Sequence, residues 1–142
     1  MAANASGPLA PELLAQLRAA IGRGDDADAL RCADAVLASE PAHEATLAWL
    51  SARARQHGAL DEAQRHARTG LAAHPRSGAL HLQLGAAQAA AGDLESADAS
   101  FRAVPAQAST HVFAQLWLGD VQARRGLRAQ SLRTRAHALA EA

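Results

Sequence analysis

The sequence predicts an all-α chain built from repeated pairs of helices, and three observations support this prediction. The 142 residues are 49% hydrophobic, which is enough for the packed core of one domain. Alanine, the strongest helix former, occurs 40 times, whereas tyrosine is absent and aromatic residues make up only 3%. Four glycines also recur at one fixed interval. A core made mainly of large side chains is therefore not expected.

The recurring glycines define a repeat. Gly24, Gly58, Gly92 and Gly126 follow one another at intervals of 34 residues. Five positions after each glycine stands a small residue, and prolines close two of the repeats. Chance does not readily place so many residues on one grid. We therefore expect four repeats, 10–43, 44–77, 78–111 and 112–142, after a flexible lead-in over residues 1–10.

Each repeat contains two apolar-periodic segments of roughly 12 residues, which is long enough for packed helices. The glycine between them can adopt the positive φ that ends the first helix, and Asp25 and Asp93 are suited to cap the second. Pro105 falls where the other repeats have leucine, so the helix before it should stop near Val104. Ser109 or Thr110 is then a suitable cap for the next helix.

This grid resembles the tetratricopeptide repeat, a helix–turn–helix unit of 34 residues. GDDADALRCADAVLASEP (24–41) is similar to its second helix, and LQLGAAQAAAGDLESADASF (82–101) is similar to a whole turn. The resemblance implies a right-handed α-solenoid of antiparallel helix pairs over 11–142. Alanines stand at most of the family's bulky aromatic positions, with Phe101 as the exception, so each interface should bury little area. The family's consensus residues are structural and leave the function open.

The resemblance also implies a concave groove lined by the first helices of successive repeats. The corresponding rows are predominantly apolar, with Arg18 and Asp120 at opposite ends. Such a groove suits an amphipathic helix or an extended hydrophobic peptide; alternatively, Trp49, Trp117 and Phe113 belong to the core. Related proteins grip a carboxylate-terminated tail through Lys, Asn and Arg, which are missing at the matching positions here. The expected contacts are Leu14, Arg18, Trp49, Ala52, Leu82, Gln83, Phe113, Leu116, Trp117 and Asp120.

Charge is distributed unevenly along the repeats. Counting Asp, Glu and Arg gives net charges of −3, +2, −2 and +3, which sum to the formal net charge of zero. The arginine-rich last helix is interpreted either as a polar end cap or as a docking surface for a further acidic or catalytic segment. A neutral chain lacks the basic excess that is typical of nucleic-acid binding. We expect a monomer.

The sequence shows no catalytic or cofactor-binding pattern. Its seven histidines have no metal-ligand spacing and are expected to be solvated, so neither a metal nor another cofactor is predicted. The single cysteine, Cys32, is expected to be a buried, inert thiol. No secretory signal or membrane-spanning stretch is recognisable, which favours a cytoplasmic protein without membrane contact.

The sequence therefore predicts a non-enzymatic protein-interaction module, either an adaptor or a chaperone, that binds a protein or peptide ligand. The alternative is the N-terminal repeat domain of a larger bacterial enzyme, of the hydroxylase or transferase type, that positions a substrate or partner protein. A third hypothesis, RNA binding, would need a basic groove.

Overall fold

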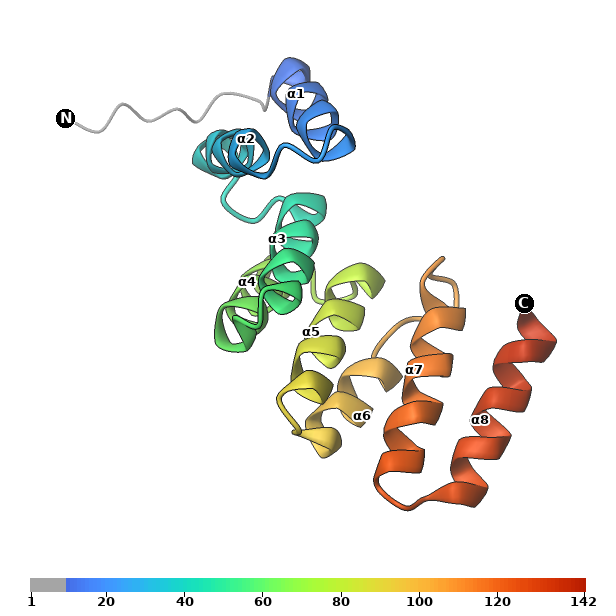
Figure 1. Cartoon of the computed structure of the whole chain (residues 1–142). Helices are drawn as coiled ribbons and strands as arrows, with labels where there is room; N and C mark the ends of the chain where they lie inside the picture. Colours follow the sequence, from blue (N-terminus) through green and yellow to red (C-terminus); the bar gives the residue numbers. More distant parts are fainter. Residues whose placement is uncertain (1–9) are drawn as a thin grey trace. The chain divides into compact units, whose positions relative to one another are not determined.

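The computed structural model describes residues 10–142 and contains eight helices and no strand in that range. The all-α prediction is therefore confirmed, while the lead-in expected over 1–10 lies outside the described residues except for Ala10. The helices form successive antiparallel pairs joined by short turns (Figure 1). They are α1 (Pro11–Gly22), α2 (Asp26–Ser39), α3 (Glu44–Gln56), α4 (Leu60–Ala73), α5 (Gly78–Ala90), α6 (Leu94–Arg102), α7 (His111–Arg124) and α8 (Arg128–Glu141).

The turn inside each helix pair has one geometry, which confirms the role predicted for the four glycines. Gly24, Gly58, Gly92 and Gly126 have φ angles of 69°, 77°, 84° and 79°. In each turn the N–H after the glycine donates to a carbonyl five residues earlier, as Ala59 does to Ala54 at 2.8 Å. This bond satisfies a carbonyl that the end of a helix leaves unpaired. The interval of 34 residues is thus the sequence separation between successive turns, which are structurally equivalent.

The caps of the second helices differ among the pairs. The carboxylates of Asp25 and Asp93 accept from the backbone N–H of Asp28 and Ser96, at 3.1 and 3.3 Å, as predicted. In contrast, α4 and α8 begin without a side-chain cap. The cap predicted at Ser109 or Thr110 is wrong, because Thr110 precedes α7 in a helical backbone conformation and its hydroxyl makes no cap bond.

The described residues divide after Thr46 into two compact units, 10–46 and 47–142, which we call the N-terminal and C-terminal units. In the N-terminal unit α1 packs on α2, and the buried side chains are small or medium in size, including Leu17, Ala33 and Val36. Cys32 is buried as predicted, with its Sγ 4.0 Å from Oδ1 of Asp28. The same carboxylate is hydrogen-bonded to Arg31, and this contact raises the pKa of the Arg31 guanidinium.

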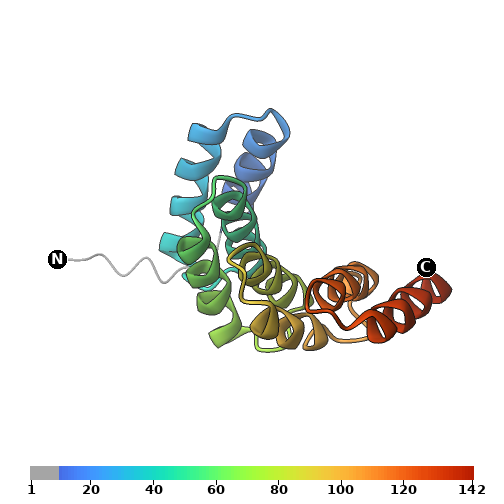
Figure 2. The same ribbon diagram turned by 60° about the horizontal axis from the view of Figure 1, so that its bottom comes forward.

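The C-terminal unit contains most of α3 and all of α4 to α8. Its core lies between α5, α6 and α7, where Phe101 is the largest fully buried side chain and contacts a cluster that includes Leu82, Leu118 and Val121. The second helix of the third repeat ends at Arg102, close to the predicted stop near Val104. Residues 103–110 then lead into α7, which runs antiparallel to α8 (Figures 1 and 2).

Small residues mark the closest contacts within these helix pairs. In α3 and α4, the hydroxyl of Ser51 donates to the carbonyl of Ala63 at 2.7 Å. In α7 and α8 the hydroxyl is on the other helix, since Ser131 donates to the carbonyl of Gly119, also at 2.7 Å. Ser51 and Gly119 occupy equivalent positions of the repeat, as do Ala63 and Ser131. Either helix of a pair can therefore supply the hydroxyl that hydrogen-bonds to the other helix.

Candidate functional site

The predicted groove residues divide between the two units. Leu14 and Arg18 lie on α1 of the N-terminal unit, where Leu14 is half-buried and Arg18 is exposed. The other eight lie in the C-terminal unit, on α3, α5 and α7. The candidate site therefore lies in the C-terminal unit.

Leu82 is a correction to the predicted contact set. Its side chain is only 8% exposed and belongs to the core cluster around Phe101. It therefore stabilises the helix packing and has almost no surface to offer a ligand. Trp49, Ala52 and Gln83 are half-buried, so each still has part of its surface accessible.

The largest exposed apolar side chains of α7 lie on one face of that helix. Phe113 is 59% exposed and Leu116 is 37% exposed, while Trp117, four residues after Phe113, is half-buried. Residues separated by three and four positions are neighbours on a helix surface. We call Phe113, Leu116 and Trp117 the α7 apolar face.

Trp117 is held in place from two sides. Its ring and that of Phe101 make a T-shaped contact, with 5.8 Å between ring centroids and an interplanar angle of 76°. On another helix, Arg55 places its guanidinium carbon 5.9 Å from the centroid of Trp117. Both contacts are favourable geometries for an aromatic ring. The alternative prediction of a core role for Trp117 is thus met in part, because the half-buried ring packs against the core cluster around Phe101.

Arg55 is a residue that the sequence analysis missed. It lies near the C-terminal end of α3, outside the rows that the resemblance assigned to the groove. Its contact with α7 depends on the length of the arginine side chain, which reaches beyond the neighbouring helix. Residue spacing carries no information about that reach, so the sequence does not pair Arg55 with Trp117.

Two polar atoms near this face have no hydrogen-bond partner. They are Nε of Arg55, a donor, and Oε1 of Gln83, an acceptor, and both are buried. Gln83 has in α5 the grid position that Trp117 has in α7, and these two helices are in contact. A buried polar atom without a partner costs about 1–3 kcal/mol. Because both atoms are covered by protein, they are a local cost to stability beside the apolar anchors of the face.

The polar end of the predicted groove is an ion pair. Asp120 is exposed and lies 3.7 Å from the guanidinium of Arg135, measured from Oδ1 to Nη2. An exposed pair of this length contributes little to stability. It sets the polar boundary of the α7 apolar face, since Asp120 follows Trp117 by three residues.

Two of the seven histidines are less solvated than predicted. The side chains of His66 and His111 are only 19% and 16% exposed, and their rings lie 3.3 Å from the carboxylates of Glu62 and Glu141. No group of three or more potential metal ligands occurs within residues 10–142. Within the same residues, no helix has the length and apolar character needed to cross a bilayer.

Comparison with known proteins relates this chain to several solved structures. Residues 41 to the end of MamA from Desulfovibrio magneticus RS-1 superpose with a TM-score of 0.76, at 19% identity, over 92% of this chain and 74% of that one. A second MamA structure gives 0.77, at 18% identity, over 91% and 70%. A tetratricopeptide repeat protein from Parabacteroides merdae ATCC 43184 gives 0.72, at 20% identity, over 87% and 49%. No family model and no curated protein matches the sequence.

Proposed function

Because this chain has the fold of the tetratricopeptide-repeat proteins, we propose that it is a protein-interaction module whose α7 apolar face binds an apolar segment of a partner protein. The observation that carries this proposal is the exposure of Phe113, a phenylalanine that is 59% accessible beside an anchored tryptophan. Clustered exposed apolar side chains are costly on a free surface and are typical of interaction sites.

The arrangement of Trp117 supports a binding role. Tryptophan and arginine are the residue types that most often dominate binding energy at protein interfaces. Here the indole is fixed between Phe101 and Arg55, so it loses little conformational freedom when a ligand covers it. Phe113 and Leu116 extend the same face toward solvent.

The surroundings of the α7 apolar face suggest the form of the ligand. The exposed carboxylate of Asp120 borders the apolar side chains, so the face is apolar with a polar edge. A helix with one apolar face and polar flanks matches both parts. An amphipathic helix is therefore the ligand that fits this face best.

This binding mode suits an adaptor or a chaperone acting without catalysis. The alternative, a repeat domain that precedes the catalytic part of a bacterial enzyme, stays a prediction, as do the cytoplasmic location and the monomeric state.

The proposal can be tested with helical peptides selected from a displayed library against the chain. We expect the selected sequences to carry large apolar residues at helical spacing. The double variant F113D/L116D should weaken their binding at least tenfold, because two exposed apolar contacts become charged. A matched control is L132D/L139D, which alters two α8 leucines that are 69% and 71% exposed. Peptides that bind F113D/L116D as well as the unmodified chain, with circular dichroism unchanged, would contradict the proposal.

A further inference from the structure

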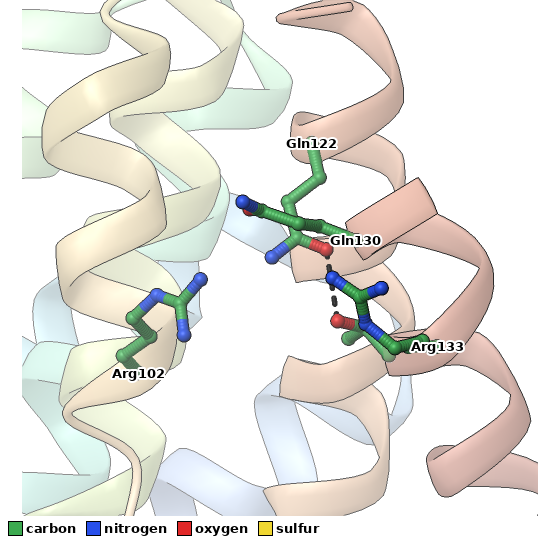
Figure 3. Close-up of a pocket in the computed structure, with 5 residues that line it drawn as sticks. Arg102, Gln122, Gln130 and Arg133 are labelled. Atoms are coloured by element: carbon green, nitrogen blue, oxygen red, sulfur yellow. Dashed lines mark hydrogen bonds between the residues drawn. The ribbon is translucent and has the colours of Figure 1, made fainter. Parts of the chain in front are cut away.

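A hollow of about 330 Å³ lies between α6, α7 and α8, and the α7 apolar face contributes no residue to it. Figure 3 shows this hollow, which we call the α6–α8 cleft, with Arg102 on one side and Arg133 on the other. Its lining contains no carboxylate, and every lining side chain can donate a hydrogen bond. The lining residues are Arg102, Gln122, Gln130, Arg133 and Thr134.

The buried amide of Gln122 is oriented by a neighbour. Its Oε1 accepts from the hydroxyl of Thr134 at 2.8 Å, and the residue is only 1% exposed. Because the oxygen is engaged, the amide nitrogen is turned to the side of Arg102, as Figure 3 shows. A buried and hydrogen-bonded side chain is a fixed element, so the cleft presents this donor in one direction.

The charges around the cleft leave a positive excess. Nε of Arg102 donates to Oδ1 of Asp98 at 2.5 Å, and Nη1 of Arg125 donates to Oδ2 of the same carboxylate at 2.9 Å. One acid is thus shared by two arginines. Arg133 has no acidic partner among residues 10–142, so its full charge is available to a ligand.

The junction of α4, α5 and α6 corresponds, one repeat earlier, to the α6–α8 cleft, and it shows which parts of the cleft recur. One repeat earlier, the hydroxyl of Ser100 donates to Oε1 of Gln88 at 2.6 Å, which reproduces the bond between Thr134 and Gln122. Arg68 stands at the position of Arg102, but Ala99 stands at the position of Arg133. The glutamine–hydroxyl bond is therefore shared by these two junctions, whereas the second arginine occurs only in the last one.

We propose that the α6–α8 cleft binds a carboxylate of an acidic segment in a partner protein, with Arg133 and Arg102 on either side of it and the amide of Gln122 beneath. A second hollow of about 650 Å³ shares Arg102 and is also lined by Arg76 and His81. Acidic side chains spaced along an extended segment would meet cations in both hollows. This site uses residues separate from the α7 apolar face and does not depend on the function proposed for that face.

The test measures binding of a fluorescein-labelled hexaglutamate peptide to the whole chain at low salt, by fluorescence anisotropy. We expect R133A to weaken binding about three- to fivefold, the size of one exposed charge contact. R68A is the control, because it removes one exposed arginine from the preceding junction, at the position equivalent to Arg102. It should leave the affinity within a factor of about 1.5. The reciprocal variant A99R should strengthen binding, since it supplies the missing cation there.

Three results would overturn this assignment. An unchanged affinity for R133A would show that the cleft is not used. An equal loss for R133A and R68A would indicate diffuse attraction of the peptide to any arginine. Displacement of the peptide by inorganic phosphate, but not by glutarate at the same ionic strength, would identify a phosphate site instead. Binding of the selected helical peptides to R133A separates this test from that of the α7 apolar face.

Discussion

The α5–α6 and α7–α8 helix pairs share one backbone arrangement but fill their closest contact with different chemistry. In α5–α6 the ring of Phe101 rests on Gly85, and a Cβ added to that glycine would lie 2.7 Å from the ring. In α7–α8 the stem of Arg135, the equivalent residue, rests on Gly119, and an added Cβ would lie 2.7 Å from its Cγ. The two pairs therefore fill this contact with side chains of similar bulk but opposite polarity.

The difference follows from where each side chain ends. Phe101 is 1% exposed and is surrounded by core residues, so only an apolar group fits there. Arg135 is exposed, and its guanidinium reaches Asp120 while its methylenes cover the glycine. Arginine can cover apolar surface and keep its charge in water. The last helix can therefore be polar on its outer side without leaving a void at Gly119.

Truncating the two equivalent side chains should give the largest contrast. F101A removes a fully buried ring and should lower the free energy of unfolding by about 3–5 kcal/mol through the cavity it creates. R135A removes an exposed stem and a weak ion pair, so its loss should stay below about 1 kcal/mol. Urea unfolding followed by circular dichroism measures both. Similar losses for the two variants would show that the stem of Arg135 is packed as tightly as the ring.

Adding one methyl group at each glycine should give a smaller contrast. G85A places its Cβ against a buried ring that cannot move away, and we expect a loss of about 1–2 kcal/mol. G119A meets a flexible, exposed stem, and the helix propensity of alanine contributes up to about 1 kcal/mol in return. Its stability should therefore stay within about 0.5 kcal/mol of the unmodified chain. Thermal melts of both variants test this ordering, which a large loss for G119A would refute.

The features that the sequence predicted correctly are those that local geometry determines. The four glycines adopt positive φ because a helix that ends in this turn requires it, and their spacing is visible without any structure. The caps at Asp25 and Asp93 depend on residues three positions away, so they too are local. The helix stop before Pro105 follows from the missing N–H of proline.

The errors and omissions concern contacts between helices. Leu82 lies on the expected row but turns into the core, because neighbouring helices already cover it. The reach of Arg55 to Trp117 crosses from α3 to α7, and no spacing rule reports it. Thr110 has the residue type of a cap, yet its backbone is helical and its hydroxyl stays unpaired. A one-dimensional pattern identifies helix faces but not which neighbour covers them.

Trp117 provides the most direct test of the central claim, which is that the α7 apolar face binds a partner helix. In a W49F variant it is the single tryptophan, so its fluorescence reports on that face alone. We predict that a selected helical peptide shifts the emission to shorter wavelength and protects it from acrylamide quenching, and that F113D/L116D abolishes both effects. A saturating peptide that changes neither the emission nor the quenching of Trp117 would contradict the account.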